Sequence, residues 1–194
     1  MIHNERCKKC KKRIYKLLSM LFGEVKENFN LNISNKPDSF INNAHYTDLK
    51  KIFNLLQKNR GYNDFIRANK LPNVDFFVVK HRFIVEFDES QHFTAPRKLT
   101  LSNYPCDLKL GYYQEKWINL CIKLNKKDND PPFRDEQRAW YDTLRDFAPT
   151  TLNLKPTIRI YARDYKWCDL NVDNDVHKIL FKKYLFSNND GALT

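Results

Sequence analysis

Apolar side chains recur with the period of a helix near the start of the chain and with the period of a strand directly afterwards. The first stripe consists of Ile14, Leu17, Leu18, Leu21 and Phe22. This spacing predicts one buried helix face, and Gly23 follows where a left-handed residue ends the helix. From Val25 to Ile33, the odd-numbered positions are largely apolar and the even-numbered positions hold asparagines, as in a strand with one polar face. The sequence therefore predicts a helix followed by an edge or half-covered strand.

The next segments predict a second helix and a hairpin. Residues 35–44 are rich in Asn, Ser and Asp and form a loop, and Thr47 is a suitable N-cap for a helix that runs to about Asn59. Residues 74–88 are rich in β-branched and aromatic side chains, with a polar break at residues 80–82. We interpret this segment as two strands joined by a tight turn.

The second half of the chain predicts three more helices and one short strand. The helices are expected near residues 117–124, 131–149 and 176–184, and the strand over residues 157–161. Strands interleaved with helices in this order predict an α/β fold with a small mixed sheet flanked by helices. We expect a single domain over residues 1–194, with a basic arm at 1–13 and an insertion at 94–133.

Charge narrows the class of partner. The chain holds 34 Lys and Arg against 23 Asp and Glu, a net charge of +11. Such an excess favours a polyanion, with nucleic acid ahead of a membrane surface. An apolar content of 42% suffices for a packed core, and no stretch is apolar enough for a membrane span. We expect a soluble, cytoplasmic protein, nucleoid-associated in a prokaryote, with DNA as its partner and RNA as the alternative.

Five cysteines are spread along the chain, and we expect them to be reduced because their number is odd and their spacing wide. Cys7 and Cys10 have the Cys-x-x-Cys spacing of half a zinc site, with His3 as the one histidine beside them. No second ligand pair follows at finger or ribbon spacing. Two interpretations stand: a basic arm with incidental cysteines, or a zinc site that a homodimer completes from two chains.

Three acids interrupt the predicted hairpin, Asp75 in its first strand and Glu86 and Asp88 in its second. Alternation places Glu86 and Asp88 on one face. A turn at residues 80–81 sets Asp75 opposite Glu86, a turn at 81–82 sets it opposite Asp88, and an odd-length turn separates the acids. Because the flanking residues are apolar, the carboxylates need a compensating cation. Oxygen ligands in this number suit Mg²⁺ or Mn²⁺, and hence phosphodiester hydrolysis.

A family resemblance is carried by residues 73–77, Asn-Val-Asp-Phe-Phe, and 84–93, Ile-Val-Glu-Phe-Asp-Glu-Ser-Gln-His-Phe. These segments resemble the PD-(D/E)xK nuclease superfamily, in particular the branch similar to very-short-patch-repair and small restriction-like endonucleases. The resemblance is looser from the first helix to Arg97 and again at residues 135–145 and 158–160. It implies a restriction-endonuclease-like α-β-β-β-α-β core and Mg²⁺-dependent DNA cleavage, with Asp75 and Glu86 as metal-binding acids.

Asp88 stands where that superfamily usually has a lysine. The resemblance implies that Asp88 is a third metal-binding carboxylate, and that Gln91 and His92 orient water or contact phosphate. The basic residues expected to contact nucleic acid are Lys80, Arg82, Arg97, Lys98, Arg134, Arg138 and Arg145. The expected function is a metal-dependent DNA endonuclease of restriction, repair or defence, alone or in a larger assembly. The alternative is a catalytically impaired nucleic-acid-binding module on the same fold.

Overall fold

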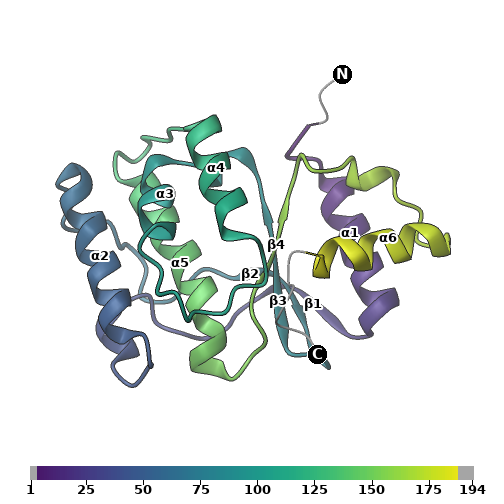
Figure 1. Ribbon diagram of the computed structural model, residues 1–194, viewed down its shortest axis with the longest axis horizontal. Coiled ribbons are helices and arrows are strands. Elements are labelled where there is room, and N and C mark those ends of the chain that lie inside the picture. The colour runs from purple at the N-terminus through teal and green to yellow at the C-terminus, as the bar shows by residue number, and fades with distance from the viewer. Residues whose placement is uncertain (1–3, 188–194) are drawn as a thin grey trace.

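A four-stranded mixed sheet forms the centre of the protein (Figure 1). The structure is a computed structural model that describes residues 4–187. Its strands are β1 (Val25–Phe29), β2 (Val74–Val78), β3 (Phe83–Asp88) and β4 (Ile158–Tyr161), side by side in that order. The pairs β1–β2 and β2–β3 are antiparallel, and β4 runs parallel to β3. The predicted α/β class is confirmed, as is the edge position of the first strand, although β1 ends at Phe29 rather than Ile33.

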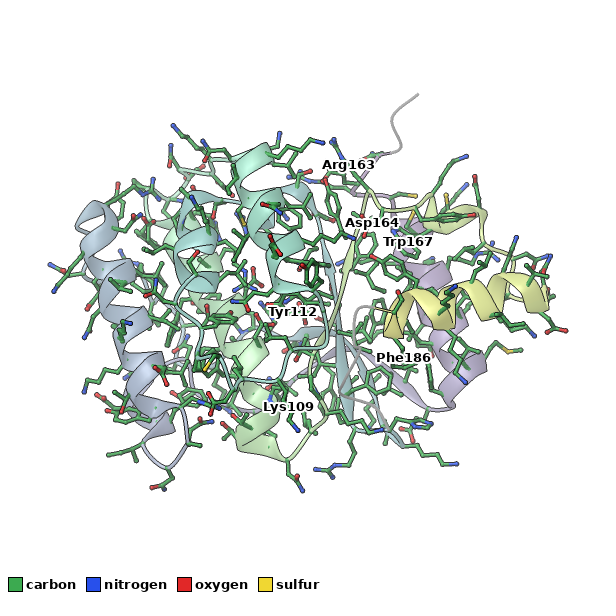
Figure 2. All side chains as sticks on the ribbon, in the orientation of Figure 1. Lys109, Tyr112, Arg163, Asp164, Trp167 and Phe186 are labelled. Carbon is green, nitrogen blue, oxygen red and sulfur yellow. The ribbon has the colours of Figure 1, made fainter. Side chains whose placement is uncertain are left out.

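Helices lie on both sides of the sheet. On one side are α1 (Lys8–Phe22) and α6 (Asp175–Phe186), and on the other are α2 (Tyr46–Arg60), α3 (Ala95–Leu101), α4 (Gln114–Leu124) and α5 (Arg134–Leu152). Three short 3₁₀ helices complete the fold: η1 (Pro37–Phe40), η2 (Ser90–His92) and η3 (Trp167–Asp169). Figure 2 shows Tyr112 on the α4 side of the sheet and Trp167 and Phe186 on the α6 side. None of these described helices is long and apolar enough to cross a membrane.

The apolar stripe of α1 packs on the sheet, as predicted. Leu17 and Leu18 are fully buried in one cluster with Phe76 of β2 and Val85 of β3. Gly23 follows the helix with a φ of +84°, a conformation that glycine adopts without strain. Because apolar contacts fix α1 against the sheet, its polar first turns are held beside the start of β2.

Two segments differ from the sequence prediction. Residues 8–13, expected in a basic arm, form the first turns of α1, and residues 1–3 lie outside the described residues. Residues 94–133 contain α4, which was predicted, and α3, which was not. Helix α3 begins at Thr94, whose hydroxyl accepts a hydrogen bond from the Arg97 N–H. Its 7 residues are too few to show a helical stripe, so only this N-cap could have revealed it.

Helix α5 continues past Pro149 to Leu152, although its end was predicted at the proline. Proline has no N–H, so it leaves the carbonyl group four residues earlier without its helical donor. That carbonyl belongs to Arg145, and it accepts a hydrogen bond from the Thr157 hydroxyl at 2.7 Å. The side chain of a residue beyond the helix therefore replaces the missing donor.

Candidate functional site

The register of the central hairpin sets Asp75 opposite Glu86. Phe76 pairs with Val85 and Phe77 with Ile84, and the next pair in this register is Asp75 with Glu86. The Asp75 N–H donates to Oε1 of Glu86 at 3.2 Å. The connection covers residues 79–82 instead of two residues, but its even length keeps both acids on one face. The first of the two predicted registers is therefore confirmed.

Asp75 lies at the margin of the site that solvent reaches. Its side chain is 26% exposed, and Oδ1 accepts a hydrogen bond from Nζ of Lys11 at 2.7 Å. Its Oδ2 accepts the Phe87 N–H at 2.9 Å, which ties the carboxylate to β3. Burial alone would lower the pKa of Lys11, but nearby carboxylates, Asp75 first among them, raise it. Helix α1 therefore places a charged ammonium group beside the first predicted metal-binding acid.

Glu86 is buried and weakly compensated. Its Oε2 lies 3.4 Å from Nε of Arg145, a nitrogen that has no hydrogen-bond acceptor among residues 4–187. Burial raises the pKa of Glu86 to about 7; the charge of Arg145 opposes this rise and that of Asp75 adds to it. A cation between Asp75 and Glu86 would stabilise both carboxylates in their charged form.

Asp88 has a different set of partners. Its Oδ2 accepts the indole N–H of Trp117 at 2.7 Å, and its Oδ1 accepts a guanidinium N–H of Arg159 at 2.8 Å. Nδ1 of His92 lies 3.7 Å from Asp88 and 2.8 Å from Oδ2 of Asp142. Ligand atoms of Asp88, His92 and Asp142 all lie within 4.8 Å of one another, so this group could also hold a metal ion. The three predicted acids therefore fall into two groups, Asp75 with Glu86, and Asp88 with His92.

Buried guanidinium groups already compensate the carboxylates near Asp88. Arg159 lies beside Glu86 on β4 and also donates from Nε to Asp146 at 2.8 Å. Asp146 accepts a second charged hydrogen bond, from Arg97 at 2.7 Å. Burial alone would raise the pKa of Asp146, but Arg159 and Arg97 lower it. Because Asp88 and Asp146 each contact a guanidinium group, neither needs a metal ion for charge compensation.

The sequence analysis missed Asp142, Asp146 and Arg159, and it gave Arg145 a different role. Asp142, Arg145 and Asp146 have the spacing i, i+3, i+4, which places them on one helix face toward the sheet. Arg159 lies in the otherwise apolar strand Ile-Arg-Ile-Tyr. Charges at helical spacing and a lone cation in a buried strand both require partners, and together they could have indicated this network.

Two arginines predicted to contact nucleic acid are buried instead. Arg97 is 1% exposed and Arg145 is 8% exposed. Arg97 donates to the hydroxyl of Tyr104 at 2.7 Å in addition to Asp146, and Arg145 donates to Asp142 at 3.2 Å. Both guanidinium groups are therefore committed to internal carboxylates, and the predicted contacts of Arg97 and Arg145 with nucleic acid are wrong.

The other predicted basic residues are scattered. Lys80 and Arg82 are exposed in the connection after β2, whose last residue lies about 10 Å along the strand from Asp75 at the usual rise. Lys98 is exposed on α3. Arg134, half-buried at the start of α5, donates to a backbone carbonyl in the preceding turn at 3.1 Å. The hairpin tip is therefore separate from the acids.

A polar cavity of about 490 Å³ lies next to the residues that directly follow β3. Glu89 and Gln91 line it, and Glu89 also contributes to the raised pKa of Lys11, which places this wall close to the Lys11–Asp75 pair. Arg138, predicted for the rim, donates to the carbonyl of Gln91 at 3.0 Å. The basic residues of the cavity wall are Arg6, Lys126, Lys127 and Arg163. The sequence analysis did not select these four. The wall also holds three acids, Glu5, Glu89 and Asp128, and Glu5 pairs with Arg163.

The site thus combines two facing carboxylates, Asp75 and Glu86, with a polar cavity nearby. His92 lies behind Gln91 with its ring against Asp142; burial alone would lower its pKa, but Asp142 raises it. Comparisons of the chain with protein-family models, with curated proteins and with solved structures gave no match in any of the three.

Proposed function

We propose that this protein is a metal-dependent nuclease that hydrolyses phosphodiester bonds in DNA. The observation that carries the proposal is the pair Asp75 and Glu86, which face each other on the central hairpin, with a polar cavity of mixed charge nearby. Two facing carboxylates, one of them partly exposed, suit Mg²⁺ or Mn²⁺, which keep several waters and take further oxygens from a substrate phosphate. When bound, such an ion polarises the phosphoryl oxygen and lowers the pKa of a coordinated water.

The order of elements supports this proposal. Without the segments that carry α2 and α3–α4, the chain runs α1-β1-β2-β3-α5-β4, the order expected of a restriction-endonuclease-like core. The two acids occupy the start of β2 and the end of β3, as the resemblance to PD-(D/E)xK nucleases implies. A shared order of elements favours this fold but does not by itself assign an activity.

Lys11 takes the place of the cation that position 88 lacks. The superfamily resemblance implies a lysine where this chain has Asp88, and Asp88 is bound to Arg159. Lys11 brings an ammonium group to Asp75 from α1 instead. We propose that it orients the scissile phosphate or the attacking water, with Gln91 as the polar group on the opposite wall.

One observation favours the alternative, a nucleic-acid-binding module with impaired catalysis. Asp88 is 1% exposed and its charge is compensated by Arg159, so it lacks the access to solvent that Asp75 has and does not complete a three-carboxylate metal site. A binding module would need the cavity but no bound metal. Its affinity would fall with salt, with a slope of about −0.9 per phosphate contact for duplex DNA.

Plasmid cleavage with Mg²⁺ or Mn²⁺ separates the two functions. We expect the wild-type protein to cleave, and Asp75→Asn and Glu86→Gln to give no product above background. Glu27→Gln is the matched control, because Glu27 is an exposed acid on the neighbouring strand β1. Cleavage by either site variant at the wild-type rate contradicts the nuclease proposal. A wild-type protein that binds DNA with a steep salt dependence but cleaves neither duplex nor single strands supports the binding module.

A further inference from the structure

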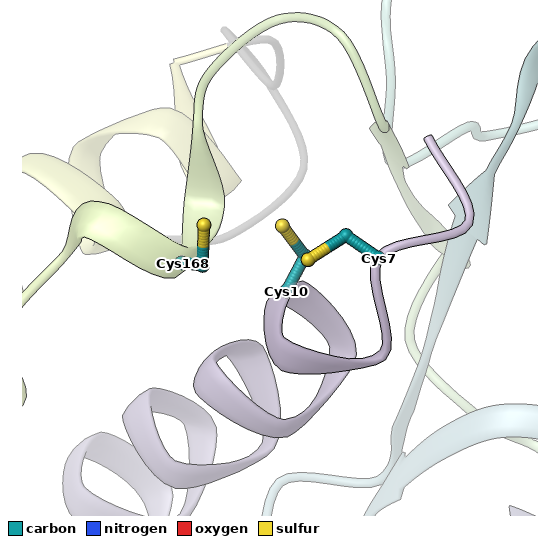
Figure 3. A group of neighbouring side chains, drawn as sticks. All are labelled: Cys7, Cys10 and Cys168. Atoms are coloured by element: carbon teal, nitrogen blue, oxygen red, sulfur yellow. The ribbon is translucent and has the colours of Figure 1, made fainter. Parts of the chain in front are cut away.

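Three cysteines far apart in sequence meet on the α6 side of the sheet (Figure 3). Cys7 is the N-cap of α1, Cys10 lies in its first turn, and Cys168 lies in η3 between β4 and α6. The three Sγ atoms all lie within 4.8 Å of one another. The sequence supplies the Cys-x-x-Cys half of this cluster, and the fold supplies the third thiol.

The backbone at the start of α1 is shaped to present two thiols together. The Cys10 N–H donates to the carbonyl of Cys7 at 2.9 Å, a turn that brings both side chains to one side. In a tetrahedral zinc site with Zn–S bonds near 2.3 Å, neighbouring sulfur atoms are about 3.8 Å apart. The observed limit of 4.8 Å is compatible with this spacing after small side-chain rotations.

The sequence around the cysteine cluster is basic. Three thiolates and Zn²⁺ carry a net charge of −1, and the chain around Cys7 and Cys10 contributes Lys8, Lys9, Lys11 and Lys12. Lys166 precedes Cys168 by two residues. A disulfide would use two of the three thiols and leave the third beside it, whereas one zinc ion uses all three.

We propose that Cys7, Cys10 and Cys168 bind one structural Zn²⁺, with a water molecule as the fourth ligand. The ion would join the start of α1 to η3, two segments separated by most of the chain. Since Lys11 directly follows Cys10, the same ion would hold the helix turn that presents Lys11 to Asp75. The site is independent of the proposed nuclease activity, because it can be measured by metal binding alone.

Titration of the reduced full-length protein with Co²⁺, followed by displacement with Zn²⁺, tests this site. We expect one equivalent to give a thiolate-to-cobalt charge-transfer band and tetrahedral d–d bands. Cys168→Ser should lower Zn²⁺ affinity by at least about 100-fold, since it removes a direct ligand. Cys106→Ser is the control, because Cys106 is exposed and outside the cluster, and it should bind like the wild type.

Alkylation of the wild-type protein tests the same proposal without a variant that has to fold. Zn²⁺ should protect Cys7 and Cys168 from iodoacetamide while Cys106 remains reactive in the same sample. Absence of the charge-transfer band in the wild type, an unchanged band in Cys168→Ser, or equal alkylation of Cys168 with and without Zn²⁺ would each overturn the proposal.

Discussion

The two faces of β3 differ in chemistry, since one is apolar and the other is charged. Phe83, Val85 and Phe87 face α1 and α6 in an apolar cluster. On the other face, Glu86 and Asp88 meet charged side chains of α5 and β4. Apolar burial is favourable whichever apolar neighbour provides the contact, whereas each buried charge depends on a particular partner. The charged face should therefore tolerate substitutions less well than the apolar face. Because buried charges are costly, they are expected at positions where a protein uses them for binding or catalysis.

The largest expected effect comes from Asp88→Lys, which rebuilds the usual superfamily pattern. In this structure the change buries an ammonium group against Arg159 and removes one of that residue's carboxylate partners. We expect a loss of more than about 5 kcal/mol in the free energy of unfolding, because a broken buried pair alone costs about 3–5 kcal/mol. Urea unfolding measures the loss. A stable Asp88→Lys variant with increased cleavage would show that the charged face is a degenerate nuclease site instead.

His92→Ala should lower the rate of cleavage more than it lowers the free energy of unfolding. His92 is partly exposed, with 19% of its side chain accessible, and it lies between the charged network and Gln91. Loss of a positioned proton-transfer or charge-stabilising group lowers turnover by about 10²–10⁴-fold. Single-turnover cleavage at saturating metal measures the effect. A variant with the wild-type rate would restrict His92 to the structural network.

Stability should fall as pH rises toward neutrality. The folded-state pKa of Glu86 is raised from 4.5 to about 7, so the folded protein holds a proton that the unfolded chain has released between these values. The contribution of Glu86 to the free energy of unfolding is fully present below pH 4.5 and is lost by pH 7. It amounts to about 3 kcal/mol. The charged groups facing Glu86 are Asp75 from β2, Arg145 and Asp142 from α5, and Arg159 from β4.

Glu86→Gln should remove most of this dependence of the free energy of unfolding on pH. Mg²⁺ or Mn²⁺ should reverse the dependence, because a bound cation favours the charged carboxylate. His92, whose pKa is also raised, adds a loss in the same direction above its ordinary pKa of 6.5. Asp146, whose pKa is lowered, changes the stability only below pH 3.8, the ordinary pKa of an aspartate. Urea unfolding at a series of pH values, with Glu27→Gln as control, measures the slope. Stability that rises between pH 5 and 7 without metal would contradict the assignment.

The smallest effect is expected on the apolar face. Leu17→Met keeps the volume of a fully buried side chain in α1 and adds no polar atom. We expect a loss below about 1.5 kcal/mol, as for other volume-conserving changes. Thermal or urea unfolding measures it. A loss as large as that of Asp88→Lys would remove the distinction between the two faces.

Helices and strands were predictable where apolar residues recur with a single period over a long segment. The α1 stripe and the alternating hairpin are of this kind. An even connection keeps the acids of the hairpin on one face, but it left two registers open, of which the structure has the first. Short α3 carries too few residues for a period. The extension of α5 past Pro149 depends on Thr157, a contact that local sequence does not report.

The candidate site was predictable only in part, for a similar reason. Local alternation predicted Asp75, Glu86 and Asp88 on one face and left the partner of Asp75 open between Glu86 and Asp88. The partners of Asp88 come from β4 and α4, which are distant in sequence. Arg97 and Arg145 carry the charge expected of surface residues, and only tertiary contacts with acids place them inside. The third cysteine of the thiol cluster likewise lies far from Cys7 and Cys10 in sequence.

Calorimetric titration with Mn²⁺ tests the central claim, that a metal binds between Asp75 and Glu86 and not at the group of Asp88, His92 and Asp142. The titration is performed on the wild type, Asp75→Asn and His92→Ala, with the cysteines first saturated with Zn²⁺. The account predicts that the wild type and His92→Ala bind Mn²⁺ with similar affinity and that Asp75→Asn does not bind it. Binding retained in Asp75→Asn and lost in His92→Ala would contradict it.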